Sequence, residues 1–185
     1  DEASIVAAAA AMADAPADLV VVASGVLTLA DGSGPERSYK QIDGAAMDEV
    51  FRLNTIGPAL VAKHMLPLLP RDRRSVFAAL SARVGSIGDN RIGGWRSYRA
   101  SKAALNMLLK NFAIELARTH KQAIVAGLHP GTVDSALSEP FQANLPAGQL
   151  TRPADAADNL LNVIDGLTVA DSGGVFDWKG EAVPA

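Results

Sequence analysis

Tyr98 and Lys102 are the two side chains whose type and spacing best suit proton transfer. They lie four residues apart in a segment with helical periodicity, so the phenol and the ammonium share one helix face. An opposite charge within about 4 to 6 Å of a phenol lowers its pKa from the ordinary value near ~10. A general acid–base group adjusted in this way contributes roughly 10² to 10⁴ in rate. The pair predicts acid–base chemistry, although Tyr-x-x-x-Lys also occurs on helix faces that contact only solvent.

The elements that must position this pair follow from apolar periodicity. Apolar residues every three or four positions between Ser97 and about His120 predict a helix that carries both side chains. The same patterns predict strands at 18–23, 75–80, 123–128 and 174–176, and further helices at 3–13, 43–66 and 153–164. Strand 18–23 is apolar throughout, which predicts burial on both faces. Alternation of strand and helix predicts an α/β fold, an open parallel sheet within one domain over 1–185.

Asn54 and Pro58 mark a special point in the expected helix 43–66. Pro58 has no N–H, so the carbonyl of Asn54 loses its helical donor and the helix should kink there. An unpaired carbonyl that faces inward can hold a water molecule. The alternative is a capping or packing asparagine beside a structural proline kink.

Pro130, Gly131, Thr132 and Val133 follow the expected strand 123–128. In open α/β sheets, ligands bind at the carboxyl ends of the strands, so this segment is a candidate for ligand contact. Read without its neighbours, Pro-Gly is only a turn signal.

The composition excludes several kinds of function. A formal net charge of −3 gives no basic surface for nucleic acid, and no apolar run reaches the roughly 18 residues of a membrane-spanning helix. The absence of cysteine excludes disulfides and Cys-ligated zinc, and the three histidines form no cluster with carboxylates. We therefore expect a cytoplasmic protein without a nucleic-acid, membrane or metal partner.

Several stretches together resemble the short-chain dehydrogenase/reductase family, closest to its branch of C-factor-like proteins and small carbonyl reductases. The stretches are Asn54–Gly57, Ser81–Ile87, Gly93–Asn106, His129–Asp134 and Asp171–Phe176, in matching order and spacing. The resemblance implies a Rossmann-type doubly wound parallel sheet. It also implies an NAD(P)-dependent oxidoreductase that transfers hydride between the nicotinamide cofactor and a small-molecule carbonyl or alcohol substrate.

The resemblance also implies roles for individual residues. Tyr98 is the acid–base group, and Lys102 lowers its pKa and holds the nicotinamide ribose. The main-chain carbonyl of Asn54 holds a water in a proton relay, and residues 130–133 contact the nicotinamide carboxamide. Gly25 ends the first expected strand, where only backbone contacts to the cofactor carry over, because the Asn-Asn-Ala-Gly of relatives is replaced here.

Two features depart from the family pattern. Many relatives carry Ser-Ser where this chain reads Ser81-Ala82, so we predict Ser81, with Ser86 as the alternative, as the hydrogen-bond donor to the substrate oxygen. Either hydroxyl could instead satisfy loop backbone groups. The sequence has no Gly-x-Gly-x-x-Gly turn, which implies a chain that lacks the first strands of a complete enzyme, about 50 to 60 residues including the pyrophosphate cradle.

These residues leave open the substrate, the choice between NAD and NADP, and the oligomeric state. The resemblance implies a homo-oligomer paired through the helices that start near 43 and 97. The alternatives to an enzyme are a non-catalytic signalling or partner-binding protein on the same scaffold, and an inactive fragment.

Overall fold

A parallel sheet of four strands forms the centre of the computed structural model, which describes residues 1–146 and 148–185. The strands run in the order β1-β2-β3-β6, and each neighbouring pair is parallel. Their bounds are Leu19–Val22 for β1, Ser75–Leu80 for β2, Ala123–His129 for β3 and Val175–Asp177 for β6. Two short strands, β4 (Thr132–Val133) and β5 (Leu150–Thr151), pair separately.

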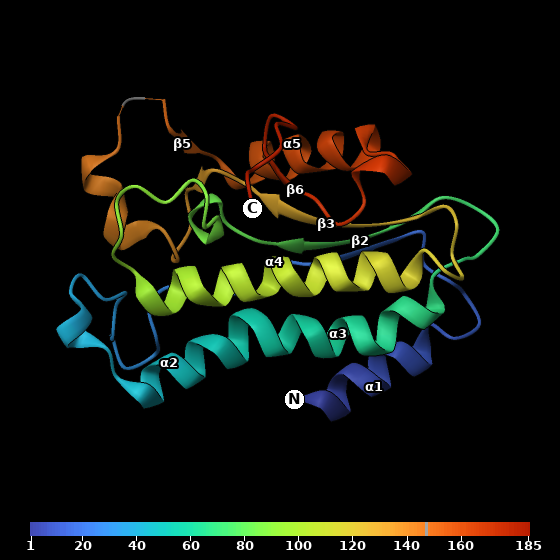
Figure 1. The fold of residues 1–185 in the computed structure, drawn as a ribbon, viewed down its shortest axis with the longest axis horizontal. Coiled ribbons are helices and arrows are strands. Elements are labelled where there is room, and N and C mark those ends of the chain that lie inside the picture. The colour runs from blue at the N-terminus through green and yellow to red at the C-terminus, as the bar shows by residue number, and fades with distance from the viewer. Residues whose placement is uncertain (147) are drawn as a thin grey trace.

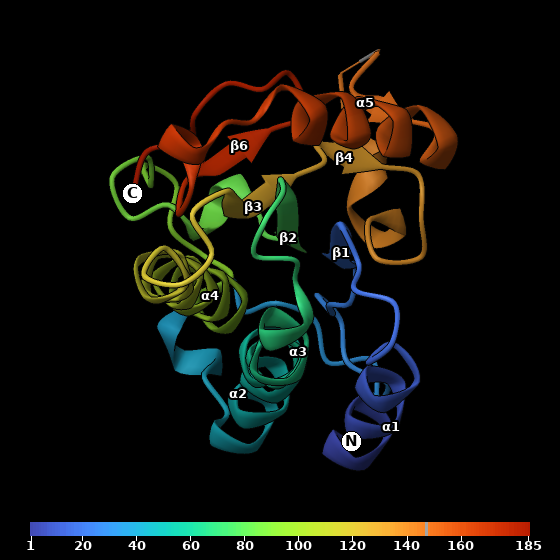
Figure 2. The ribbon, with the colours of Figure 1, turned by 90° about the vertical axis from the view of Figure 1, so that its right-hand side faces the viewer.

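Helices cover both faces of this sheet, as Figures 1 and 2 show. On one face lie α1 (Glu2–Ala11), α2 (Gly44–Phe51), α3 (Gly57–Met65) and α4 (Arg96–Leu116). The opposite face carries α5 (Pro153–Gly166). The predicted α/β architecture of Rossmann type is thereby confirmed. In the part of the chain that the structure describes, no helix combines the length and apolar character needed to cross a bilayer.

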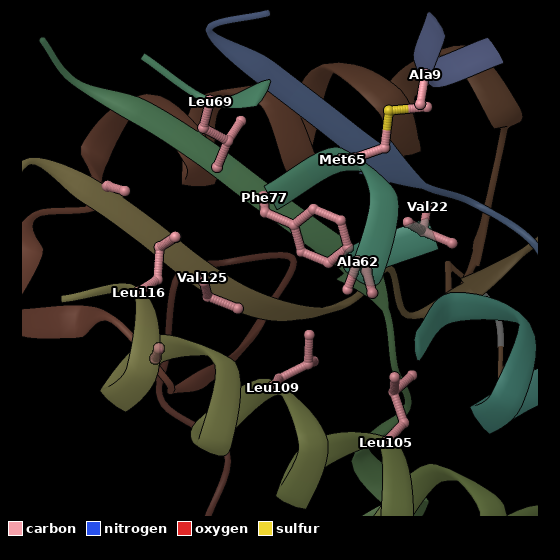
Figure 3. Packing of buried hydrophobic residues seen from close by; sticks show 13 residues of the cluster. Ala9, Val22, Ala62, Met65, Leu69, Phe77, Leu105, Leu109, Leu116 and Val125 are labelled. Carbon is pink, nitrogen blue, oxygen red and sulfur yellow. The ribbon is translucent and has the colours of Figure 1, made fainter. Parts of the chain in front are cut away.

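Alternate residues of β2 and β3 enter two separate apolar cores. Phe77 and Val125 face α3 and α4 (Figure 3), whereas Val76 and Ile124 face α5. Burial on both faces explains why these strands are apolar throughout.

The prediction of burial on both faces is wrong for β1. Val22 packs in the core beneath the helices, but Leu19 and Val21 are 40% and 43% exposed. The reason is that β1 is an edge strand of the described sheet.

The kink predicted near Pro58 takes the form of a π-helical turn. Asp43 caps α2 by accepting from the amide of Ala46, and residues 52–56 then widen into the π turn that leads into α3. Gly57 donates its N–H to the carbonyl of Arg52 within this turn. Insertion of one wide turn accommodates a proline that cannot donate. The turn buries Asn54 and Thr55, and the Thr55 hydroxyl donates to the Ser101 carbonyl of α4 at 2.8 Å.

Leu109 holds α4 against the sheet and is 1% exposed. A Cβ on Gly127 of β3 would lie 3.2 Å from its Cδ1, so helix and strand approach closely here. We predict that Leu109→Ala lowers the free energy of unfolding by about 2–5 kcal/mol, because the cavity cannot fully collapse. Denaturant unfolding monitored by circular dichroism measures this, with Ile114→Ala, 54% exposed on the same helix, as the control. Equal losses in the two variants would contradict the packing described.

Candidate active site

A cavity of about 1400 Å³ opens at the carboxyl ends of β1, β2 and β3. Its lining brings together most of the residues predicted from sequence: Gly25, Ser81, Tyr98, Lys102, Pro130, Gly131, Thr132 and Val133. Asn54 lies behind the wall and is fully buried. Residues from four separate parts of the chain therefore meet where open α/β sheets bind ligands.

Tyr98 and Lys102 occupy the first two turns of α4 and face this cavity together. Tyr98 is 9% exposed and Lys102 only 3%. The Lys102 Nζ donates to the carbonyl of Leu80 at 2.8 Å and lies 5.7 Å from the centre of the Tyr98 ring. The carbonyl at the end of β2 thus fixes the ammonium beside the phenol, in a cation–π arrangement.

The electrostatics of this pair differ from the prediction. Burial raises the pKa of Tyr98 to about 12, whereas Lys102 was expected to lower it. Burial also lowers the pKa of Lys102 to about 8. In both cases the cause is desolvation, which penalises the charged form of each buried group. At neutral pH Tyr98 is therefore a neutral phenol with a proton to donate.

Asn54 acts through its side chain, which the sequence prediction did not include. The amide of Val26 donates to Asn54 Oδ1 at 2.8 Å, and Asn54 Nδ2 donates to the Val26 carbonyl at 2.8 Å. Nδ2 also lies 3.2 Å from the Ser101 Oγ of α4. A single buried amide therefore joins the loop after β1 to the π turn and to the helix of the acid–base pair.

The hydrogen bonds of the Asn54 side chain to Val26 and Ser101 are called the Asn54 clamp. Gly25 lies very close to this clamp. A Cβ at position 25 would lie 3.2 Å from Asn54 Oδ1 and 3.4 Å from Lys102 Nζ. Because residue 25 has no side chain, its backbone can lie this close to the buried ammonium at the cavity wall. This is a place where a ligand can approach the backbone closely.

The two candidate serines are placed differently. Ser81 lines the cavity, but its hydroxyl donates to Asn106 Oδ1 at 2.5 Å. Ser86 Oγ accepts from the amide of Asp89 at 3.0 Å and is not among the described residues that line the cavity. Ala82 packs in one apolar cluster with Tyr98, so a methyl group stands beside the phenol.

The segment after β3 forms another wall of the cavity. Gly131 adopts a left-handed conformation with φ +76°, and a Cβ there would lie 3.1 Å from the Trp178 indole. Thr132 and Val133 then pair with Leu150 and Thr151. Both constraints hold the backbone of residues 130–133 against the cavity.

Glu36 is a structural determinant of the site that the sequence analysis missed. Its carboxylate accepts from the amide of Ser97 at 3.1 Å and from the Ser97 hydroxyl, and its carbonyl accepts from the amide of Trp95 at 2.6 Å. Trp95 occupies the N-cap position of α4, but its side chain makes no capping hydrogen bond. Glu36 thus caps the helix of Tyr98 from a distant loop. The available signal was the N-cap position itself, which is Trp95 and not Ser, Thr, Asp or Asn.

Trp95 and Phe141 form an aromatic wall next to Tyr98. The Trp95 ring lies 6.3 Å from the Tyr98 ring, edge to face, and 5.0 Å from the Phe141 ring. Trp95 has a positive φ of 49°, rare for a residue other than glycine. The sequence gave no signal for the contact between Trp95 and Phe141.

His129 also lines the cavity. Burial lowers its pKa, an effect that the charge of Arg83 reinforces and that of Asp177 opposes, so the imidazole is neutral at pH 7. Among the described residues, no group of three or more His, Cys, Asp or Glu side chains is arranged to hold a metal ion.

The comparisons with known proteins agree with this architecture. A family model described as short chain dehydrogenase matches residues 2–146. The "C-signal" protein of Myxococcus xanthus is 35% identical over 169 residues, 91% of this chain and 93% of that protein. The "1-hydroxy-2-glutathionyl-2-methyl-3-butene dehydrogenase" of Rhodococcus sp. is 37% identical over 123 residues, and the match spans only 51% of its length. The NADPH-bound carbonyl reductase from chicken fatty liver superposes with a TM-score of 0.83 and 27% identity, over 100% of this chain and 74% of that chain.

The Glu36 cap generates a stability prediction. Desolvation raises the pKa of Glu36, but the Ser97 hydrogen bonds and the Arg96 charge outweigh it, so the pKa lies below the ordinary 4.5. We predict that Glu36→Gln lowers the free energy of unfolding by about 1–2 kcal/mol at neutral pH. Because folding lowers this pKa, the loss should be complete above pH 4.5 and disappear as the pH falls through the folded value.

Urea unfolding at several pH values measures the Glu36 effect. Glu115→Gln, which removes an exposed carboxylate from the far end of the same helix, is the matched control. A pH-independent difference between Glu36→Gln and the unsubstituted chain would contradict the cap.

The acidity of Tyr98 can be read directly, because the chain has two tyrosines. Tyr39→Phe removes the one that is 67% exposed and leaves Tyr98 as the single phenol. We predict no phenolate absorbance below pH ~10 in the folded protein, and a midpoint at about 12, because burial disfavours the phenolate. Circular dichroism at each pH shows whether the chain is folded. A midpoint below that of free tyrosine would show that Lys102, not burial, dominates.

Proposed function

Because the chain belongs to the short-chain dehydrogenase/reductase family, we propose that it is an NAD(P)-dependent oxidoreductase that interconverts a carbonyl and an alcohol. The family model matches residues 2–146. The observation that carries the proposal is the buried pair of Tyr98 and Lys102 on the wall of the cavity at the carboxyl ends of the strands, with the backbone of Gly25 close to the ammonium. A proton donor, a cation and room for a ligand therefore lie together.

The residues present fit the nicotinamide end of such a cofactor. Gly25 and Lys102 line the cavity side by side, so Nζ could donate to ribose hydroxyls there, and residues 130–133 offer backbone groups at the cavity wall. The bound cofactor would supply or accept the hydride. The NADPH named for the chicken carbonyl reductase makes NADP(H) as well as NAD(H) a cofactor to test.

Tyr98 would move the proton. Its pKa of about 12 keeps the phenol protonated at neutral pH, so Oη donates to the substrate oxygen as negative charge develops there. The resulting phenolate is stabilised by the ammonium of Lys102, which keeps its proton below its pKa of about 8. We propose that reprotonation runs through a water held at the main-chain carbonyl of Asn54.

A second hydrogen bond to the substrate oxygen would come from Ser81. Ala82 offers only a methyl group beside Tyr98, whereas the Ser81 hydroxyl lines the cavity. Rotation of this hydroxyl away from Asn106 frees its proton.

The wider setting is also part of the proposal. The partner is a small carbonyl or alcohol compound, and the cytoplasm, where reduced nicotinamide cofactors are available, is the expected location. The surfaces of α2 and α4 would pair subunits if the chain forms a homo-oligomer.

A second candidate is a non-catalytic signalling protein on the same scaffold. It is favoured by the likeness to a protein named C-signal, of which the match covers 93%. Ala82 also favours a non-catalytic role, because many relatives carry a serine at this position. Such a protein would not depend on the proton of Tyr98.

We predict that Tyr98→Phe lowers NAD(P)H-dependent turnover of aryl ketones by about 10² to 10⁴, because the ring remains and the transferable proton is lost. Loss of NADPH or NADH absorbance measures turnover, and circular dichroism verifies the fold. Tyr39→Phe, at an exposed position, is the matched control. Equal activity of the two variants would reject Tyr98 as the acid and favour the non-catalytic alternative.

A further inference from the structure

Arg99 is a guanidinium in the proposed active site without an assigned role. It follows Tyr98 in α4 and lines the same cavity. Its Nη1 donates to the carbonyl of Val84 at 3.1 Å, which fixes the planar group. Its Nε is buried and has no hydrogen-bond partner among the described residues, but it has no surface that a ligand could reach. The donor left for a ligand is Nη2, which is not fully buried and makes no hydrogen bond within the described residues.

The charges around the cavity favour an anionic ligand. Its charged lining consists of the cations Arg37, Arg83, Arg91, Arg99 and Lys102 and, among the described residues, the single acid Asp89. Asp89 is already paired with Arg83 at 2.7 Å, and Lys102 is bonded to Leu80. The remaining arginines form no ion pair within residues 1–146 and 148–185. Their positive potential is therefore uncompensated at the site.

The wall next to Tyr98 is apolar and partly aromatic. Leu27 and Ala82 pack with Tyr98 in one cluster, and Val84, Trp95 and Phe141 extend it. The main-chain amide of Trp95 donates to the Glu36 carbonyl at 2.6 Å, and its indole packs against the rings of Tyr98 and Phe141. Aromatic side chains of this kind favour stacking or edge contacts with a flat apolar group.

We propose that the substrate is a flat, apolar carbonyl compound that carries a carboxylate, and that Arg99 binds this carboxylate. The inference rests on the proposed function and specifies its substrate class. A guanidinium matches the two oxygens of a carboxylate, and the anchor at Val84 holds the fork in place. The carbonyl then faces Tyr98 while the apolar body contacts Trp95 and Phe141. Cofactor phosphates are the other source of negative charge, and the experiment distinguishes the two.

The test compares two aryl ketones that differ only in charge, 4-acetylbenzoate and its methyl ester. Arg99→Gln is expected to lower kcat/KM for the acid by about 10- to 100-fold, as for a lost charge-assisted hydrogen bond. For the ester the change should stay below about twofold, because the ester makes no ion pair. Arg118→Gln removes the same charge from an exposed position beyond the far end of α4 and should affect neither compound.

Each outcome of these measurements either supports or overturns the assignment of Arg99 to a substrate carboxylate. An equal loss for acid and ester in Arg99→Gln would overturn the proposal. A rise in the NADPH dissociation constant of Arg99→Gln, measured by fluorescence, would assign Arg99 to a cofactor phosphate and overturn it as well. If neither ketone is reduced, the proposed function fails on its own, and calorimetry with 4-acetylbenzoate still tests the anion site. Binding to the unsubstituted chain and not to Arg99→Gln supports the site, and no binding to either rejects it.

Discussion

The site depends on the hydrogen bonds that the buried side chain of Asn54 makes. Its amide pairs with both backbone groups of Val26 and reaches Ser101, so it joins the loop after β1 to the helix that carries Tyr98 and Lys102. A buried amide must satisfy its donors and acceptors, which makes this arrangement specific. The π turn before Pro58 directs Asn54 inward. Loss of these hydrogen bonds would let the loop of Gly25 move away from the buried ammonium and disrupt the wall of the space proposed for the nicotinamide.

Burial shifts the pKa values of Tyr98 and Lys102, the two ionisable groups that the clamp positions, in opposite directions. It raises the pKa of Tyr98 to about 12 and lowers that of Lys102 to about 8. Both shifts disfavour charge, so the site holds a neutral phenol beside a cation that gives up its proton more readily than usual. This pairing suits the proposed reduction of a carbonyl, in which the developing alkoxide would receive the proton of the phenol and the ammonium would stabilise the remaining phenolate. Glu36 supports this arrangement from outside by capping the same helix.

Local periodicity predicted much of the fold, because helices and strands buried on known faces leave a direct pattern. Strand 75–80 and the start of a helix near residue 43 appear as predicted. The exposed face of β1 was not predictable, since its edge position is a property of the assembled sheet. The spacing of Tyr98 and Lys102 predicted their shared face but not the direction of the phenol pKa shift, which depends on burial. Glu36 was missed because its contact with Ser97 joins residues 61 positions apart.

The most direct test of this account is a fluorescence titration of NADPH and NADH into the chain and its Gly25→Val variant. A side chain at position 25 would begin 3.4 Å from Lys102 Nζ and 3.2 Å from Asn54 Oδ1, so valine would fill the proposed nicotinamide-ribose space. The account predicts saturable binding of at least one cofactor by the unsubstituted chain and its loss in the variant, with circular dichroism unchanged. No saturable binding by the unsubstituted chain, or equal binding by both proteins, would contradict it.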